Sequence, residues 1–452
     1  MIDPSLTTPF LVASAVPVDA PHRSGTLEAA RALLASQPAL TEHSVYAAAV
    51  TGNAPLVRQW LQHDPTLATT HGGPHHWDPL TWCCFSRWLR DEPSRHAEFV
   101  EVARVLLEAG APANTGFMDH THGETPQRES ALYGAAGVAF CAPLTALLLA
   151  HGADPNDEEV PYHAAEQYAH DVVAALLAAP VPLTRDSLAT MLLRAADWHD
   201  DTGVALLLQH GVLPDHPGRW PHSPFVQAVR RDNEARIVER MLEAGADPQR
   251  RFGEVTALEL AAWHGRTDLL QRFAERGVPL PDEGLAAVAV DVTLGDAHAA
   301  RARLSRDTMV REAFLDRTAA FACRAAGNGM LAPLGVLLQW LPTVDARWAE
   351  GDGYWDIAPH STPLHVAAWR AQHAVVRLLI EAGADVHTRD GRGRTPLQRA
   401  VAACVDSYWT DRRQPESVRA LLEAGASAEG IALPTGYDAI DALLARRTSR
   451  TG

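Results

Sequence analysis

The chain of 452 residues contains no lysine, so all 39 of its basic side chains are arginines. This absence excludes every mechanism that needs a lysine amine, including Schiff-base formation and the phosphate-binding lysine of nucleotide loops and kinases. A site for an anion must instead use arginine, histidine or backbone N–H groups. The 55 acidic residues give a formal net charge of −16. We therefore expect no nucleic-acid partner and no attachment to an anionic membrane.

Cysteine is also scarce, with five residues and no CxxC spacing: Cys83, Cys84, Cys141, Cys323 and Cys404. The odd count and irregular spacing exclude an ordinary disulfide framework and favour a cytoplasmic location. A charge-free run of twenty residues, 131–150, is long enough to span a bilayer. Because Pro143 interrupts this run, we expect two short helices there and no membrane segment.

A repeated pattern is what the chain does contain. Its clearest copy begins with Thr362-Pro363-Leu364-His365-Val366-Ala367-Ala368 and ends with Leu378-Leu379-Ile380-Glu381-Ala382-Gly383. Proline is tolerated at the start of a helix, and glycine ends a helix at positive φ without a steric penalty. Similar terminators end at Gly110, Gly152, Gly211, Gly245, Gly277 and Gly425. Two successive spacings are 34 (245−211) and 32 (277−245), and we interpret the longer gaps as degenerate copies or inserted loops.

This unit resembles the ankyrin repeat, whose period is about 33 residues. The resemblance covers about residues 25–445 in about eleven copies, several of them degenerate and with enlarged finger loops. It implies an all-α solenoid of paired antiparallel helices with finger loops and a concave groove, because one helix pair cannot bury its apolar face alone. We expect an irregular N-terminal lead-in over residues 1–23, the repeat array over 24–436, and a capping helix and tail over 437–452.

Five connections are long or atypical: residues 69–78, 114–130, 214–223, 345–361 and 406–415. Long loops are often functional, and neighbouring fingers of such a stack lie side by side. One hypothesis is a divalent metal such as zinc, held by fingertip side chains from the first two loops, with Glu124 as a further carboxylate. These residues are His75, His76, Asp119, His120 and His122. Their spacing matches no known metal motif, so solvated or partner-contacting fingertips are the alternative, and no other cofactor is expected.

The ankyrin resemblance also implies that residues following the Ala-Ala pair of each unit face the groove. Aromatic and arginine side chains, which dominate binding energetics, recur there and in the fingers. The predicted groove residues are Trp82, Tyr168, Trp198, Arg230, Arg231, Trp263, His264, Trp355, Trp369 and Arg370. The alternative is that the rings fill gaps between degenerate repeats. His163 and His365 occupy a histidine position that is structural in the family.

Two functions remain open from the sequence. The first is a recognition scaffold that binds a protein or peptide through the concave groove. The alternative is an enzyme or small-molecule binder in the same groove, metal-dependent through the fingertip histidines. The chain has no G-x-S-x-G, H-E-x-x-H, dinucleotide-binding or kinase motif. The sequence therefore names no catalytic residue and leaves the question of an enzyme undecided.

Overall fold

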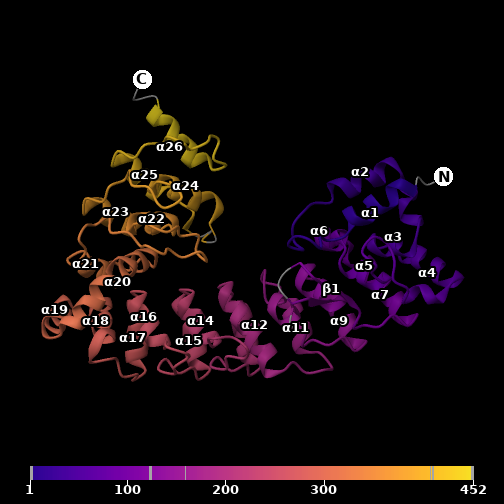
Figure 1. Cartoon of the computed structure of the whole chain (residues 1–452), viewed down its shortest axis with the longest axis horizontal. Helices are drawn as coiled ribbons and strands as arrows, with labels where there is room; N and C mark the ends of the chain where they lie inside the picture. The colour runs from indigo at the N-terminus through magenta and orange to yellow at the C-terminus, as the bar shows by residue number, and fades with distance from the viewer. Residues whose placement is uncertain (1–3, 122–124, 158, 408, 410–411, 449–452) are drawn as a thin grey trace. The chain divides into compact units, whose positions relative to one another are not determined.

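The structure is a computed structural model (Figure 1). Most of it consists of helix pairs that follow one another along the chain. It describes residues 4–121, 125–157, 159–407, 409 and 412–448. The chain forms two compact units, Met1–Asp247 and Pro248–Gly452, which are called unit 1 and unit 2 below. The expected all-α solenoid of paired helices is confirmed, with one small β-hairpin as an addition.

Unit 1 contains two continuous rows of packed helices. The inner row is α3 (Val45–Val50), α5 (Pro79–Cys84), α8 (Ala131–Tyr133), α10 (Glu159–His163), α12 (Arg185–Asp197) and α14 (Pro224–Arg230). The outer row is α4 (Ala54–His63), α7 (His96–Glu108), α9 (Ala142–Ala150), α11 (His170–Leu177), α13 (Asp201–Gln209) and α15 (Ala235–Glu243). The remaining elements are η1 (Pro4–Leu6), α1 (Thr7–Ser14), α2 (Glu28–Ser36), η2 (Pro38–Glu42), η3 (Pro65–Ala68), α6 (Arg87–Asp91), η4 (Pro93–Arg95), β1 (Gly116–Asp119), β2 (Gln127–Ser130) and the π-helical turn η5 (Gly134–Val138).

Unit 2 repeats the arrangement. Its inner row is α16 (Ala257–Trp263), α18 (Gly284–Thr293), α20 (Thr308–Gly327), α22 (Pro363–Trp369) and α24 (Pro396–Asp406). Each of these helices is paired with the next one in sequence: α17 (Thr267–Glu275), α19 (Ala297–Arg306), α21 (Leu331–Leu337), α23 (His373–Glu381) and α25 (Glu416–Glu423). The described chain ends in α26 (Asp438–Thr448), where the sequence places a capping helix.

Local chemistry explains where these helices begin and end. At the start of α22 the Thr362 side chain accepts a hydrogen bond from the His365 N–H, and the His365 side chain accepts one from the Thr362 N–H, which makes a capping box. Pro363 follows at the first helical position, where its missing N–H leaves no donor unsatisfied. The second helix of the pair ends at Gly383, whose φ is +88°. His365 Nε2 also lies 3.0 Å from the Arg394 carbonyl oxygen of the next repeat. The structural role expected for His365 is thus confirmed, and burial lowers its pKa to about 4.

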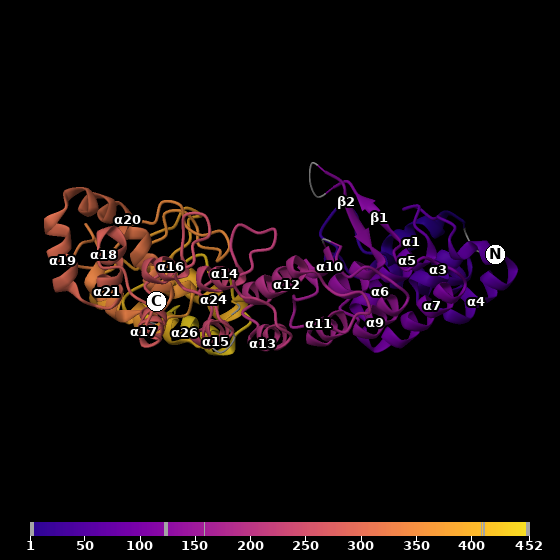
Figure 2. The ribbon, with the colours of Figure 1, turned by 90° about the horizontal axis from the view of Figure 1, so that it is seen from below.

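Two sequence expectations need correction. The lead-in over residues 1–23 is not irregular throughout, because α1 forms there and its Phe10 side chain is fully buried. The finger at 114–130 is not a simple loop: β1 and β2 pair antiparallel, with Phe117 opposite Glu129 (Figure 2). The charge-free run of residues 131–150 does form short helices, α8 with its π-helical extension and then α9. Across the described residues, every helix is too short or too polar to cross a bilayer.

Candidate functional site

The ten residues predicted to line a groove divide into two classes by exposure. Five are buried, with exposed fractions of 7% or less: Trp82, His264, Trp355, Trp369 and Arg370. These five side chains are buried within the chain, and their part in a binding groove stays a prediction. The other five are partly or fully accessible: Tyr168, Trp198, Arg230, Arg231 and Trp263. Tyr168 is the most accessible aromatic of the set, with 56% of its surface exposed.

Trp82 is buried because the first finger folds over it. Its indole N–H donates to the Gly72 carbonyl oxygen at 3.1 Å. The His75 ring stacks on it with centroids 5.3 Å apart, and the Trp77 ring lies at 5.0 Å. The Trp77 ring in turn stacks on Phe117 of the hairpin at 4.6 Å. Trp82 therefore packs against the first finger, which in turn contacts the hairpin finger, so the Trp82 ring makes its contacts within the chain.

Trp355 and Trp369 are buried because the enlarged finger at 345–361 packs against α22 and α24. The Trp369 indole N–H donates to the Trp355 carbonyl oxygen at 2.5 Å. The Arg370 guanidinium lies 4.5 Å from the Trp355 ring centroid and 5.2 Å from that of Trp409, in the loop at 406–415. These contacts make the rings a core that fastens two inserted loops, which is the gap-filling alternative raised from the sequence.

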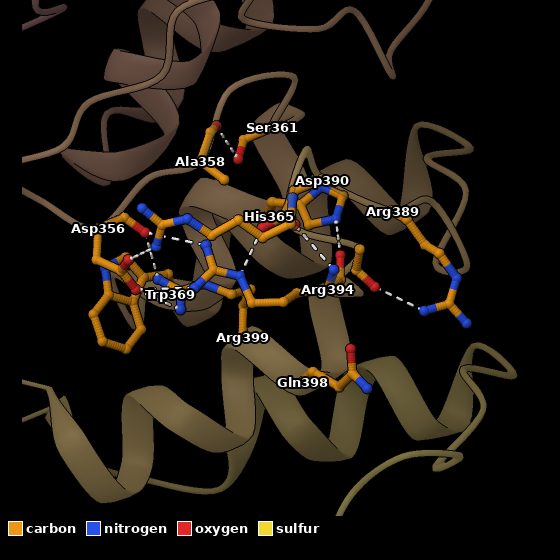
Figure 3. A network of polar contacts seen from close by, with 12 residues as sticks. Asp356, Ala358, Ser361, His365, Trp369, Arg389, Asp390, Arg394, Gln398 and Arg399 are labelled. Carbon is orange, nitrogen blue, oxygen red and sulfur yellow. Dashed lines mark hydrogen bonds and ion pairs between the residues drawn. The ribbon is translucent and has the colours of Figure 1, made fainter.

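Three arginines gather around Asp356, which belongs to the same enlarged finger at 345–361 (Figure 3). The Asp356 carboxylate contacts Arg392, Arg394 and Arg399, the last two at 3.0 and 2.9 Å. Burial alone would raise the pKa of Asp356, but the charges of these arginines outweigh it and lower the pKa. Arg399 also lies over the Trp369 ring at 3.8 Å, and burial lowers its pKa to about 10. All of these groups have partners within the chain, so the cluster is structural.

An open hollow of about 590 Å³ lies on unit 1 and is the best candidate for binding. Phe140, Tyr168 and His170 line it together with Arg23 and Arg90. The Tyr168 hydroxyl donates to the Trp198 carbonyl oxygen at 3.2 Å, and the two rings pack edge to face at 6.1 Å. Arg23 lies over the Phe140 ring at 5.1 Å. The hollow thus combines an exposed aromatic surface with arginine side chains, both of which are enriched in binding hot spots.

A row of ion pairs supports this side of the inner helices. His163 lies 3.3 Å from both Glu159 and Glu166, and Arg194 lies 2.5 Å from Glu166 and 2.7 Å from Asp197. Burial disfavours the charge of His163, but hydrogen bonds and charges from the two glutamates outweigh it and raise its pKa to about 9. The role expected for His163 is therefore revised from a packing residue bonded to backbone to a charged partner of two carboxylates.

Several members of this surface were missed by the sequence analysis, namely Arg23, Phe140, Glu166 and Arg194. Phe140 carried a usable signal. It stands five residues after Ala135, where other repeats carry a glycine at positive φ between the paired helices, such as Gly52 and Gly265. Of the predicted arginines, Arg231 pairs with Asp197 at 3.1 Å, whereas the Arg230 side chain is exposed. Arg23 could not be found by repeat alignment because it lies before the first repeat.

The two histidine-rich fingers do lie together, around a hollow of about 550 Å³ lined by residues of both. His75, His76, Asp119 and His120 all line it, but within the described part of the chain no three His, Cys, Asp or Glu side chains are grouped to hold a metal ion. Asp119 instead accepts hydrogen bonds from the Thr121 N–H and hydroxyl at 2.8 and 2.6 Å. His122 and Glu124 lie outside the described residues, so the metal site stays a prediction.

Comparison with known proteins identifies the repeats. Residues 345–400 match the family model described as ankyrin repeats (many copies). A probable E3 ubiquitin-protein ligase from Oryza sativa subsp. japonica is 32% identical over 97 residues, 20% of this chain and 18% of the relative. Ankyrin repeat and SOCS box protein 16 from Mus musculus is 41% identical over 68 residues, 15% of each chain. A putative ankyrin repeat protein from Rickettsia bellii is 41% identical over 66 residues, 15% of this chain and 24% of the relative.

Each match therefore spans less than a quarter of the relative's own length. Among solved structures, the human ASB11 ankyrin repeat domain covers 66% of this chain and 99% of its own, at 16% identity and a TM-score of 0.24. The matched segment 345–400 contains the Thr362-Pro363-Leu364-His365 motif, the capping box of α22 and the glycine that ends α23. Residues 345–400 are therefore similar to ankyrin repeats, and the paired helices of both units follow the same helix-turn-helix arrangement along the chain.

Proposed function

We propose that this protein is an interaction scaffold that binds a peptide segment of another protein in the open hollow of unit 1 that Phe140 and Tyr168 line. Ankyrin repeats generally serve protein interactions, so the class of function follows from the family. The single observation that supports this site is Tyr168, which keeps 56% of its surface exposed beside Phe140 and Arg23. A tyrosine presented in this way supplies a large contact area at a small entropic cost.

The chemistry of the hollow defines the peptide that would fit it. An apolar side chain would pack on the rings of Tyr168 and Phe140, and water would be excluded by the surrounding polar rim. Arg23 keeps 39% of its side chain exposed although it also lies 3.8 Å from Glu166. It would meet a carboxylate of the peptide. The expected ligand is thus a short segment with one large apolar residue next to an acidic one.

The test is selection from a displayed peptide library, followed by binding of the enriched peptides to the purified full-length protein. Tyr168→Ala is expected to weaken binding at least tenfold, which corresponds to about 1.4 kcal/mol. Leu213→Ala is the matched control, because Leu213 is a similarly exposed apolar residue of unit 1, at 54%, outside the hollow. Failure to enrich any peptide, or equal affinity for both variants, would contradict the proposal.

A metal-dependent site in the finger hollow is the second candidate. The observation that favours it is that side chains of the two histidine-rich fingers, including His71, His76 and His120, line one hollow. Elemental analysis of the purified protein after exhaustive dialysis tests it. The hypothesis predicts one equivalent of zinc or another divalent metal, lost in a His76→Ala, His120→Ala double variant. Metal-free protein that keeps its helical circular dichroism would remove this candidate.

A further inference from the structure

A non-helical segment near the N-terminus lies across the inner side of unit 1. Residues 15–26, called the strap below, follow α1 and run beside α6 (Figure 1). At one end, the Val16 N–H donates to the Phe85 carbonyl oxygen at 2.9 Å, and Ala15 pairs with Ser86 as an isolated bridge. Towards the other end, Arg23 lies 3.8 Å from Glu166, just after α10. The strap therefore spans three successive repeats, from α5 to α10.

Two arginines of α6 hold the main chain of the strap rather than its side chains. Arg90 donates to the carbonyl oxygens of His22, Ser24 and Gly25 at 2.6, 3.0 and 2.9 Å. Arg87 donates to the carbonyl oxygens of Ala13 and Thr26 at 3.1 and 3.2 Å. Every peptide has main-chain carbonyl oxygens that can accept such hydrogen bonds, whatever its sequence. This arrangement is therefore a general peptide clamp, with specificity left to side-chain pockets.

One side-chain pocket is built around His22. Its imidazole is buried and lies 5.9, 6.2 and 6.0 Å from the rings of Phe85, Phe117 and Tyr133. Nδ1 lies 2.7 Å from the Pro17 carbonyl oxygen, and Nε2 lies 3.7 Å from Glu129 Oε2. That Glu129 oxygen is buried and has no hydrogen-bond partner. A buried carboxylate is costly without a positive partner, so this pocket favours a cationic side chain.

The strap is fastened less firmly than the helices beneath it. Val16 and His22 are its deeply buried large side chains, whereas Asp19, Pro21 and residues 23–26 are exposed. It contains no helix or strand. Its opening therefore breaks these contacts, the arginine hydrogen bonds and the bond from the Thr121 hydroxyl to the Val18 carbonyl oxygen, but no hydrogen bond within the repeat helices. Segments with few buried contacts open at low free energy.

We infer that the surface under the strap is a second peptide-binding site, filled in cis by residues 15–26 and open to a partner segment that carries a cationic histidine six residues after a valine. The site shares Arg23 and Arg90 with the proposed Tyr168 hollow, but its His22 pocket is built from residues outside that hollow. Being tethered, the strap competes at an effective concentration on the order of millimolar. A partner segment therefore binds only when it exceeds this competition or when the strap has been loosened.

The test adds a fluorescent peptide with the sequence of residues 13–27 to the full-length protein and measures anisotropy. The wild-type chain is expected to bind it weakly, because its own strap fills the site. The His22→Ala chain should bind the unchanged peptide at least tenfold more tightly, since its strap has lost its anchor. Adding Glu129→Gln to that chain should reverse the gain. His151→Ala, which alters an exposed histidine at the end of α9 and outside both hollows, is the control and should behave as wild type.

Two outcomes would overturn the inference: a folded His22→Ala chain that binds the peptide no better than wild type, or binding that Glu129→Gln leaves unchanged. If His22→Ala does not fold, Val16→Ala loosens the other anchor by removing two methyl groups and serves the same comparison. Tyr168→Ala should leave binding of the strap peptide unchanged. Failure of the hollow and failure of the strap site are therefore distinguishable.

Discussion

Phe140 and Tyr168 place their rings at the hollow from an unusual backbone conformation. Their φ angles are +50° and +59°, in the left-handed region, at the turn between the paired helices of each repeat. Other repeats have glycine there, such as Gly52 and Gly265, with φ of +75° and +67°. A side chain in this conformation costs about 1–2 kcal/mol. Residues other than glycine adopt similar φ angles at the equivalent turns of other repeats, namely His199, Asp232 and Ala371. This conformation is therefore a property of the repeat turn, which the hollow uses to present the two rings.

The charge of His163 gives a prediction about pH. Its native pKa of about 9 lies above the unfolded value of about 6.5, so the native state holds a proton that the unfolded state releases between these values. The stabilisation is complete below about pH 6.5 and is lost as pH rises through 9. His163→Gln should lower the free energy of unfolding at pH 6 by on the order of 1–2 kcal/mol, after allowance for partial exposure.

The measurement is urea unfolding at pH 4.5, 6, 7.5 and 9, in wild type and His163→Gln. The difference between the two proteins should shrink as pH rises. His365 provides an internal control with the opposite sign. Its native pKa of about 4 lies below the unfolded value, so its stabilisation is lost as pH falls from about 6.5 to 4. That acid limb should be the same in both proteins. A difference that grows towards pH 9 would contradict the assignment.

Single residues could be predicted from the sequence where the repeat itself determines their environment. The structural role of His365 follows from its place in the repeat motif, and the structure confirms it. Trp369 has an equally clear place, yet it is buried, because the inserted finger at 345–361 folds over it. The motif gives a position within one repeat, whereas burial also depends on how an insertion folds, and the motif carries no information about that.

The same limit applies to whole elements. Helices closed by proline, capping residues and glycine were predictable, and so was the division of residues 131–150 at Pro143. The helix α1 was missed because Pro9 lies inside it. Proline is tolerated in the first turn of a helix, where its missing N–H has no partner to lose. The hairpin of β1 and β2 was missed because strands of four residues are too short to show alternation.

The enlarged finger at 345–361 depends on Asp356, and removing that carboxylate tests its role. Arg399 is the critical partner, because only 5% of its side chain is exposed and its charge would be left unpaired. Asp356→Ala should lower the free energy of unfolding by on the order of 2 kcal/mol, since Asp356 itself is partly exposed. Asp201→Ala is the matched control. Asp201 also pairs with two arginines, Arg236 and Arg240, but these are well exposed, so a loss within about 1 kcal/mol is expected.

Chemical denaturation followed by circular dichroism measures both variants. Equal losses for Asp356→Ala and Asp201→Ala would show that the arginine cluster contributes no more than a surface ion pair does. An intermediate variant, Arg392→Ala, removes only an exposed partner of Asp356 and should cost little.

At the scale of the whole molecule, the free energy of unfolding depends mainly on contacts between repeats that are adjacent in sequence. Each inner helix packs on the next inner helix, as α20 does on α22 and α22 on α24. Stability in such a stack is approximately a sum of the repeats' own stabilities and the interfaces between adjacent ones. A local defect should therefore weaken its own repeat most and adjacent repeats less. It should leave distant repeats unchanged, unlike in a globular domain, where all elements unfold together.

Hydrogen exchange on the Asp356→Ala protein tests this expectation directly. Amide protection should fall most in α22 and α24, whose surfaces the finger covers, and less in α20 and α25. Helices of unit 1, such as α12 and α14, belong to another compact unit and should keep their wild-type protection. The reason is that the lost contacts involve only Arg392, Arg394 and Arg399, all within one short stretch of unit 2. A uniform loss of protection across both units would instead show that the chain unfolds as one cooperative body, and the nearest-neighbour account would be wrong.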